Sequence, residues 1–206
     1  MLNLFYSPGA ISRATLITLE ELEADYTLTR VDFANGEQHT ADYLKINPLG
    51  RVPALQTDSG LLTETPAVLT YLAHRLPQKN MALANDNWAH AQIQSFNSLL
   101  ASTLHVNHAH GRRGSRWATE QASFDDMAAM VPKTMAASVQ LVEDRIEGPW
   151  VMGEHFTICD PYLFTIAGWL EGDGVDLEQF PKVSKHLKAM AERPAVVAAL
   201  NAETGN

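Results

Sequence analysis

The chain of 206 residues carries 24 acidic and 15 basic side chains, which gives a formal net charge of −9. An acidic balance argues against a general nucleic-acid binder, which usually presents a basic face, and no segment has the roughly 18 uncharged apolar residues of a membrane span. The first residues lack the basic region of a secretory signal, and the single cysteine, Cys159, excludes an internal disulfide framework. We therefore expect a cytoplasmic protein, without membrane or nucleic-acid partners, that acts on small molecules.

The first part of the chain mixes the periods of strands and helices. Residues 2–6 alternate as a strand does, residues 12–24 have a helical apolar stripe, and residues 26–33 form a second predicted strand. A strand, a helix and a strand in this order favour a parallel pair with a right-handed crossover.

A hairpin and a helix are predicted next. Residues 52–57 and 61–63 flank the turn signal DSG, which is typical of an antiparallel hairpin. The helix is expected over residues 65–75, with Thr65 as N-cap and Pro66 at the first helical position.

After Pro77 the sequence changes character. The polar stretch PQKNMALANDN indicates a linker, and helical patterns follow it over residues 88–110, 117–147, 159–170, 183–191 and 195–202. We therefore predict a mixed α/β domain over residues 1–78, a linker over 79–87 and an all-helical domain over 88–206.

Three short motifs stand out. In GRVPAL, Pro53 precedes a strand, and a cis Val52-Pro53 bond would turn the backbone of Val52 toward a ligand; an ordinary trans bond is the alternative, favoured because only about one X–Pro bond in twenty is cis. In TETPA, the Thr65 hydroxyl and the first helical N–H groups form an anion site. The carboxylate of Glu64 beside them could take an ammonium group, so the pair suits a free amino-acid end; a plain helix cap is the alternative.

The third motif, FTICDPYLF, has the spacing of a capping box. Thr157 and Asp160 lie three residues apart ahead of an apolar helix. We expect them to fix the start of a core helix, with Cys159 a buried packing residue and not a nucleophile.

In this order and spacing the sequence resembles the soluble glutathione S-transferase family, most closely its bacterial beta-like members. The resemblance lies in LFYSPGAISRA, NPLGRVPAL, LLTETPAVLTYLA, TLH, FTICDPYLF and MAERPAV. It implies a thioredoxin-like N-terminal domain that binds glutathione as co-substrate, a C-terminal helical bundle with a hydrophobic substrate pocket, and a two-fold homodimer. It also implies that a cis Val52-Pro53 bend meets the cysteinyl part and that Glu64 and Thr65 hold the γ-glutamyl part.

The sequence departs from the beta-like pattern at one position. Those members carry cysteine after PGA, where this chain has Ile11. No Cys-x-x-Cys is present either, which disfavours thioredoxin-type redox chemistry. The nearest hydroxyl belongs to Ser12, which we expect to stabilise the glutathione thiolate; capping of the helix over residues 12–24 is its alternative role. Tyr6 is a second candidate.

Residues 104–116 concentrate histidine and arginine. The resemblance gives His105 an active-site role, with a solvated or cleft-wall position as alternative. His105 and His108 also have metal-ligand spacing, but no carboxylate follows before Glu120, so we expect no metal. Three arginines suit an anionic electrophile or the carboxylates of glutathione, and a solvated helix end fits them equally: Arg112, Arg113 and Arg116.

The sequence thus predicts an enzyme that conjugates glutathione to a small hydrophobic electrophile. The alternatives are a glutathione-dependent isomerase or dehalogenase, and a non-catalytic family member that binds a partner protein. Fold does not decide among them.

Overall fold

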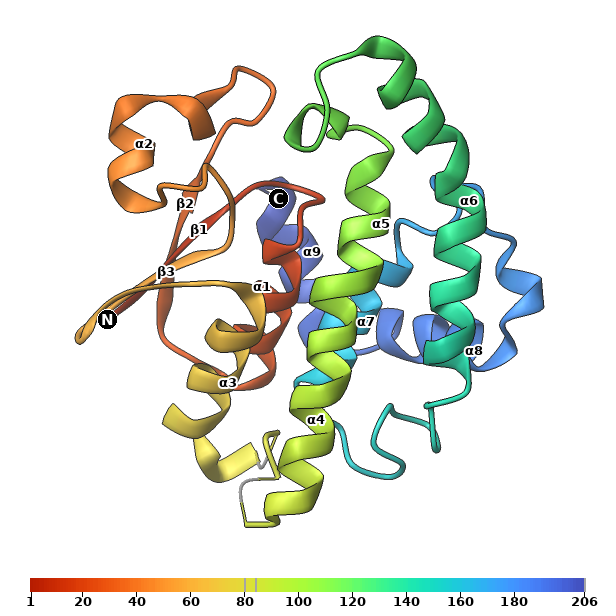
Figure 1. The fold of residues 1–206 in the computed structure, drawn as a ribbon. Helices are drawn as coiled ribbons and strands as arrows, with labels where there is room; N and C mark the ends of the chain where they lie inside the picture. The colour runs from red at the N-terminus through yellow and green to blue at the C-terminus, as the bar shows by residue number, and fades with distance from the viewer. Residues whose placement is uncertain (80, 84, 206) are drawn as a thin grey trace.

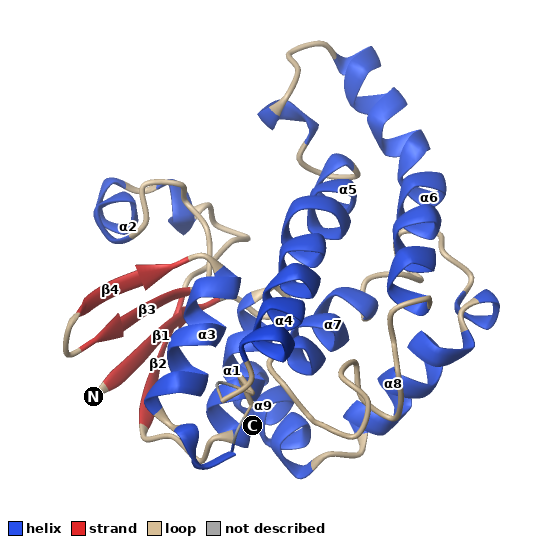
Figure 2. Ribbon diagram, turned by 60° about the horizontal axis from the view of Figure 1, so that its bottom comes forward, coloured by secondary structure: helices blue, strands red, loops and turns tan. Residues whose placement is uncertain are grey.

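The computed structural model describes residues 1–79, 81–83 and 85–205. Its N-terminal half (Figure 1) is built on a four-stranded sheet in the order β2-β1-β3-β4 (Figure 2). The strands are β1 (Leu2–Tyr6), β2 (Tyr26–Arg30), β3 (Ala54–Thr57) and β4 (Gly60–Thr63). β1 and β2 are parallel, and β3 is antiparallel to both β1 and β4. The predicted parallel pair and hairpin are therefore confirmed, although β2 ends three residues early.

Helices cover both faces of this sheet (Figure 2). The alternate β1 side chains Leu2, Leu4 and Tyr6 belong to the main core, with α1 (Ser12–Glu21) and α3 (Thr65–Arg75). The opposite face carries a smaller cluster, in which Phe5 packs edge-on against Tyr43 of α2 (Ala41–Ile46) at 6.2 Å between ring centroids. The helix α2 was not predicted from the sequence.

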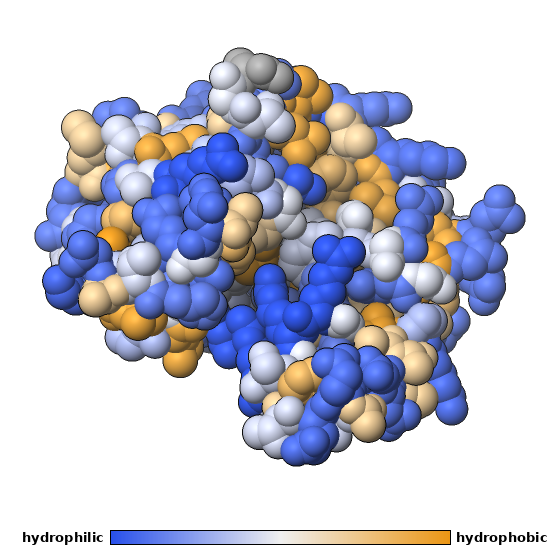
Figure 3. All heavy atoms as spheres, turned by 90° about the horizontal axis from the view of Figure 1, so that it is seen from above, coloured by the Kyte–Doolittle hydropathy of each residue, from blue (hydrophilic) through white to orange (hydrophobic). Residues whose placement is uncertain are grey.

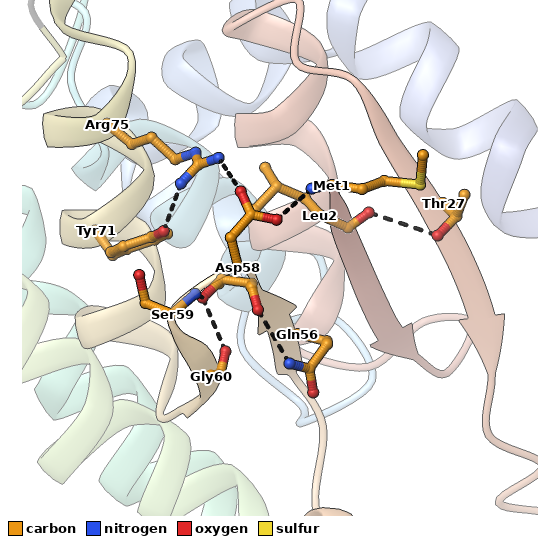
Figure 4. Close-up of polar contacts among 10 residues, drawn as sticks. Met1, Leu2, Thr27, Gln56, Asp58, Ser59, Gly60, Tyr71 and Arg75 are labelled. Atoms are coloured by element: carbon orange, nitrogen blue, oxygen red, sulfur yellow. Dashed lines mark hydrogen bonds and ion pairs between the residues drawn. The ribbon is translucent and has the colours of Figure 1, made fainter.

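The turn between β3 and β4 is tied to two other parts of the N-terminal half (Figure 4). The carboxylate of Asp58 accepts a hydrogen bond from the amino group of Met1 at 2.5 Å and from Arg75 Nη2 of α3 at 2.8 Å. Arg75 also donates to the Tyr71 hydroxyl at 2.9 Å. These groups are exposed, so solvent screens the ion pairs, and the buried strand residues Ala54 and Leu55 do more to hold the hairpin in place.

The C-terminal half is helical. Its helices are α4 (Asn87–Leu99), α5 (His105–His110), α6 (Gln121–Glu143), α7 (Cys159–Ala167), α8 (Pro181–Ala191) and α9 (Pro194–Thr204). Short turns of 3-10 helix lie at Glu37–His39, Pro77–Lys79, Gly114–Arg116 and Leu177–Gln179. A π-helical turn, Leu100–Leu104, joins α4 to α5, so the run predicted over residues 88–110 is continuous. The run predicted over 117–147 is shorter, because the helix begins only at Gln121. No described helix is both long and apolar enough to cross a membrane.

The start of α7 has the predicted capping interactions. The Asp160 carboxylate accepts hydrogen bonds from the Thr157 amide at 2.7 Å and the Val151 amide at 2.9 Å, and the Thr157 hydroxyl accepts one from the Cys159 amide at 3.3 Å. His186 of α8 adds a contact to Asp160 at 3.0 Å. Cys159 is fully buried as predicted, and its burial raises the pKa of the thiol.

One core runs through both halves, with α1 between the sheet and the helices α7 and α9. Two ion pairs fasten α1 to the C-terminal half. Arg13 contacts Glu203 at 2.8 Å and Arg193 contacts Glu21 at 2.7 Å.

The predicted linker, residues 79–87, includes residues 80 and 84, which lie outside the described residues. Of the remainder, Met81 and Ala82 are buried in the core, and the Met81 carbonyl accepts a hydrogen bond from the Ile158 amide at 3.1 Å. The boundaries drawn at 78 and 88 stay predictions.

Candidate active site

A cavity of about 700 Å³ lies between the two halves, within the range of roughly 300–1,000 Å³ typical of ligand sites. Seen from above, the molecule is hollowed there, with strongly hydrophilic side chains around the hollow (Figure 3). Its walls come from the corner before α1, the segment before β3, the start of α3, and α5 with the turn after it. Five predicted site residues line it: Val52, Pro53, Glu64, Thr65 and His105. Ser12 and Tyr6 are not among the lining residues.

The Val52-Pro53 bond is cis, so the trans bond that the rarity of cis bonds favoured is wrong, and the bend implied by the family resemblance is confirmed. Neither the amide nor the carbonyl of Val52 has a hydrogen-bond partner among the described residues. The preceding turn is held firmly, because the Arg51 carbonyl accepts from Tyr43 Oη at 2.7 Å and from Asn47 Nδ2 at 2.8 Å. Gly50 adopts φ +60°, and a Cβ there would lie 2.8 Å from a backbone oxygen. The fold therefore presents an unpaired stretch of backbone to the cavity.

The start of α3 forms a second wall. Thr65 is the first residue of the helix, and Glu64, not Thr65, occupies the N-cap position with φ +67°. The predicted cap is thus displaced by one residue. A non-glycine residue in this region costs about 1–3 kcal/mol, and such residues gather at functional sites. The amides of Thr65 and Ala67 have no intrahelical partner. The N-terminal end of α3 therefore offers these N–H groups and the Thr65 hydroxyl beside the exposed Glu64 carboxylate.

Ser12 lies behind the cavity wall. Its side chain is fully buried, and its hydroxyl accepts from the Ser7 amide at 3.2 Å and donates to the Ser7 carbonyl at 3.3 Å. The N-cap of α1 is Ile11, without a side-chain cap, so Ser12 is not the helix cap. Both hydrogen bonds join it to Ser7, which lines the cavity, so the expected contact between the Ser12 hydroxyl and a sulfur stays a prediction. Tyr6 is also buried, in the core beneath the sheet.

The backbone at the start of α1 offers a further hydrogen-bond donor. At the start of α1 the amides of Arg13 and Ala14 are bonded to the carbonyls of Ala10 and Ile11. The amides of Ile11 and Ser12 have no hydrogen-bond partner among the described residues, and Ile11 lines the cavity. A helix N-terminus with free N–H groups favours negative charge.

A series of contacts through aromatic rings connects α5 to Gly9, in the segment that precedes α1. The Trp169 indole N–H donates to the Gly9 carbonyl at 3.1 Å. The His108 ring stacks on Trp169 at 4.3 Å between centroids, and its Nδ1 lies 2.8 Å from an Asp173 oxygen. Trp169 and Asp173 were missed from the sequence, since neither belongs to a local motif.

His105 faces the cavity beside these aromatic rings, with its ring 5.4 Å from that of Trp169. Burial lowers the pKa of His105 to about 3, and the positive charge of Arg113 acts in the same direction. The imidazole is therefore neutral at neutral pH. Within the described ranges no group of three or more His, Cys, Asp or Glu side chains could hold a metal ion.

Four arginines line the cavity: Arg51, Arg112, Arg113 and Arg116. None of them pairs with a carboxylate in the described part of the chain. Burial lowers the pKa of Arg113 and Arg116, and the charge of Arg51 lowers both further. Arg51 was missed by the sequence reasoning, although it directly precedes Val52.

A thioredoxin-like half and a helical half, joined around a cavity lined by the backbone of a cis proline, define a two-part protein of the glutathione-transferase type of fold. The profile for the glutathione S-transferase N-terminal domain matches residues 2–74, and that for the glutathione S-transferase C-terminal domain matches residues 114–203. The chain belongs to the glutathione S-transferase family.

Similar proteins agree over nearly the full length. Glutathione S-transferase GstA of Escherichia coli O157:H7 is 33% identical over 205 residues, covering 98% of each chain. A glutathione transferase homologue from Sulfitobacter, solved with bound glutathione, is 48% identical with a TM-score of 0.95, covering 98% of each chain. A beta-class glutathione S-transferase from Sphingomonas chungbukensis is 30% identical with a TM-score of 0.84 and the same coverage. The predicted family and fold class are therefore confirmed.

Proposed function

We propose that this protein transfers glutathione, as its thiolate, to a small electrophile. The observation that carries this proposal is the meeting of three features at one cavity: the unpaired Val52 backbone, the start of α3 and the start of α1. The bound glutathione of the Sulfitobacter homologue supports it.

The γ-glutamyl end of glutathione is a free amino acid, and the start of α3 suits it. The Thr65 hydroxyl and the amides of Thr65 and Ala67 donate to its carboxylate, while the Glu64 carboxylate accepts from its ammonium group. The Val52 amide and carbonyl pair with the cysteinyl backbone, as one strand pairs with another. These contacts orient the sulfur toward the corner before α1.

Activation of the thiol requires a lower pKa at the sulfur. A thiol of pKa ~8.5 is only a few per cent thiolate at neutral pH, and lowering that value by two units takes about 2.7 kcal/mol. One hydrogen bond to a charged group contributes about 1.5–3 kcal/mol, and the helix dipole about 0.3–1 kcal/mol. We assign the donor to the amide of Ile11, which lines the cavity, with the Ser12 hydroxyl holding the turn that positions it.

The transfer step itself then needs little further chemistry from the protein. The sulfur lone pair forms the bond to the electrophilic carbon, and the leaving group departs with its bonding pair. Neutral His105 forms part of the wall on the acceptor side and does not take a proton from the thiol, because its pKa of about 3 makes it a poor base.

The test removes the recognition of the γ-glutamyl end. The variant Glu64→Ala/Thr65→Val should bind glutathione at least about a hundredfold more weakly in titration calorimetry, since a charged pair and a charge-assisted hydrogen bond are lost. The control Glu178→Ala/Thr119→Val makes the same changes at exposed positions outside the cavity and should bind normally. Unchanged affinity in the first variant would show that α3 does not hold the γ-glutamyl part.

We further propose a two-fold homodimer in the cytoplasm. Support comes from large apolar side chains left exposed on α4 and α6: Trp88, Met130 and Leu141. Closed two-fold dimers are also the commonest soluble oligomers.

A further inference from the structure

The charge inside the cavity is opposite to that of the whole protein. The chain has a net charge of −9, yet among the described residues four arginines and one carboxylate, that of Glu64, line the cavity. Figure 3 shows the hydrophilic side chains gathered around this hollow. Cations held together without carboxylate partners repel one another and are partly desolvated, so a bound anion is favoured there.

Glutathione does not account for all of these charges. Its γ-glutamyl carboxylate is taken by the start of α3 in the proposed function, which leaves one glycyl carboxylate. Arg51 directly precedes the Val52 backbone, which the proposed function pairs with the cysteinyl part of glutathione, so we assign Arg51 to the glycyl carboxylate. Arg113 and Arg116 come instead from the C-terminal half, after α5, and remain without an assigned anion.

The cavity that these two arginines line has features of a site for an amphipathic molecule. The cavity also has apolar and aromatic lining from the C-terminal half: Ala101, Val106, Ala109, Trp117, Tyr162 and Trp169. The guanidinium group presents a planar fork that matches a carboxylate. A cationic end beside an apolar wall fits a ligand with a hydrophobic body and a negatively charged group.

We propose that the second substrate is an electrophile that carries a carboxylate, bound by Arg113 and Arg116 while its apolar body lies against the helical half. This inference rests on the proposed glutathione transfer and narrows its acceptor from any hydrophobic electrophile to an anionic one.

The first test measures binding with the glutathione site filled by S-methylglutathione, an unreactive thioether. Titration calorimetry compares 3,5-dinitrobenzoate with 3,5-dinitrobenzamide, which share a ring, lack a leaving group and differ in charge. The benzoate should bind at least about tenfold more tightly, since it gains charge-assisted hydrogen bonds. In R113Q/R116Q the preference should fall to within about twofold.

A matched control removes the same two charges elsewhere. R30Q/R145Q changes two exposed arginines outside the cavity and should keep the preference for the benzoate. Equal binding of both ligands to the unsubstituted protein would overturn the proposal. A preference that survives in R113Q/R116Q, together with weaker binding of S-methylglutathione, would also overturn it, because these arginines would then serve the carboxylate of glutathione.

A second test measures turnover with 4-chloro-3,5-dinitrobenzoate and the corresponding amide, each rate divided by its uncatalysed rate. The glutathione sulfur forms a bond to the ring carbon, chloride leaves with the carbon–chlorine pair, and the thiol proton passes to solvent. We expect kcat/KM to favour the benzoate by about tenfold or more, and R113Q/R116Q to abolish this preference. Failure to conjugate either compound would count against the proposed transfer, whereas the binding ratio would still decide the anion site.

Discussion

Substitution of Ser12 by alanine separates a structural role from a catalytic one. Ser12 accepts a hydrogen bond from the Ser7 amide at 3.2 Å, and Ser7 is itself buried. The Ser7 carbonyl keeps its bond from the Ala10 amide, so Ser12→Ala leaves one buried N–H without an acceptor. Such a group costs about 1–3 kcal/mol. At roughly 2–4 °C per kcal/mol for a chain of this size, Tm should fall by about 2–12 °C.

The activity of Ser12→Ala should change much less. The amide of Ile11 remains, so kcat/KM should fall less than about tenfold, well below the hundredfold or more expected for loss of a direct oxyanion donor. Calorimetric unfolding and the ultraviolet absorbance of the bound thiolate measure the two effects. As control, Thr18→Val removes a buried hydroxyl of α1 that donates to the Ala14 carbonyl. An unchanged Tm with loss of the thiolate signal in Ser12→Ala would refute this reasoning and return the hydroxyl to the sulfur.

Two further predictions concern a partly buried histidine and a fully buried aspartate. His105 should stay neutral above about pH 5 in NMR titration, because its pKa lies near 3; since the unfolded chain takes up this proton near pH 6.5, His105 lowers stability as the pH falls between those values. A titration midpoint of His105 near 6.5 would contradict this environment. Asp160→Asn should lower the free energy of unfolding in urea by about 3–5 kcal/mol, because an amide cannot accept all the bonds from Val151, Thr157 and His186. A loss below about 1 kcal/mol would show that these bonds contribute little.

Elements with a strong local pattern could be predicted from the sequence. Strand β1, the hairpin and α3 lie where alternation, the DSG turn and the Thr65-Pro66 signal placed them. The short α2 was missed because its six residues are too few to show a helical period. Its N-cap, Thr40, accepts a hydrogen bond from the Tyr43 amide and was the one local signal available.

Only some of the site residues could be predicted, because only some of them belong to a local sequence motif. Val52, Pro53, Glu64 and Thr65 could be found because they belong to short motifs that carry the family resemblance, although the cis bond and the position of the α3 cap did not follow from those residues alone. The role of Ser12 could not be found in this way. Whether a hydroxyl at a helix start turns toward a cavity or toward a buried amide depends on the packing around it.

The sequence by itself determined the element types, the thioredoxin-like and helical halves, and the family, because these depend on periodicity and on motifs a few residues long. The tertiary structure alone decided which groups meet in the cavity. Arg51 lies near Arg113 and Arg116, across 62 and 65 positions of sequence, and Trp169 reaches Gly9 across 160 positions. No local pattern encodes such contacts, since they arise only when the shared core fixes one half of the chain against the other.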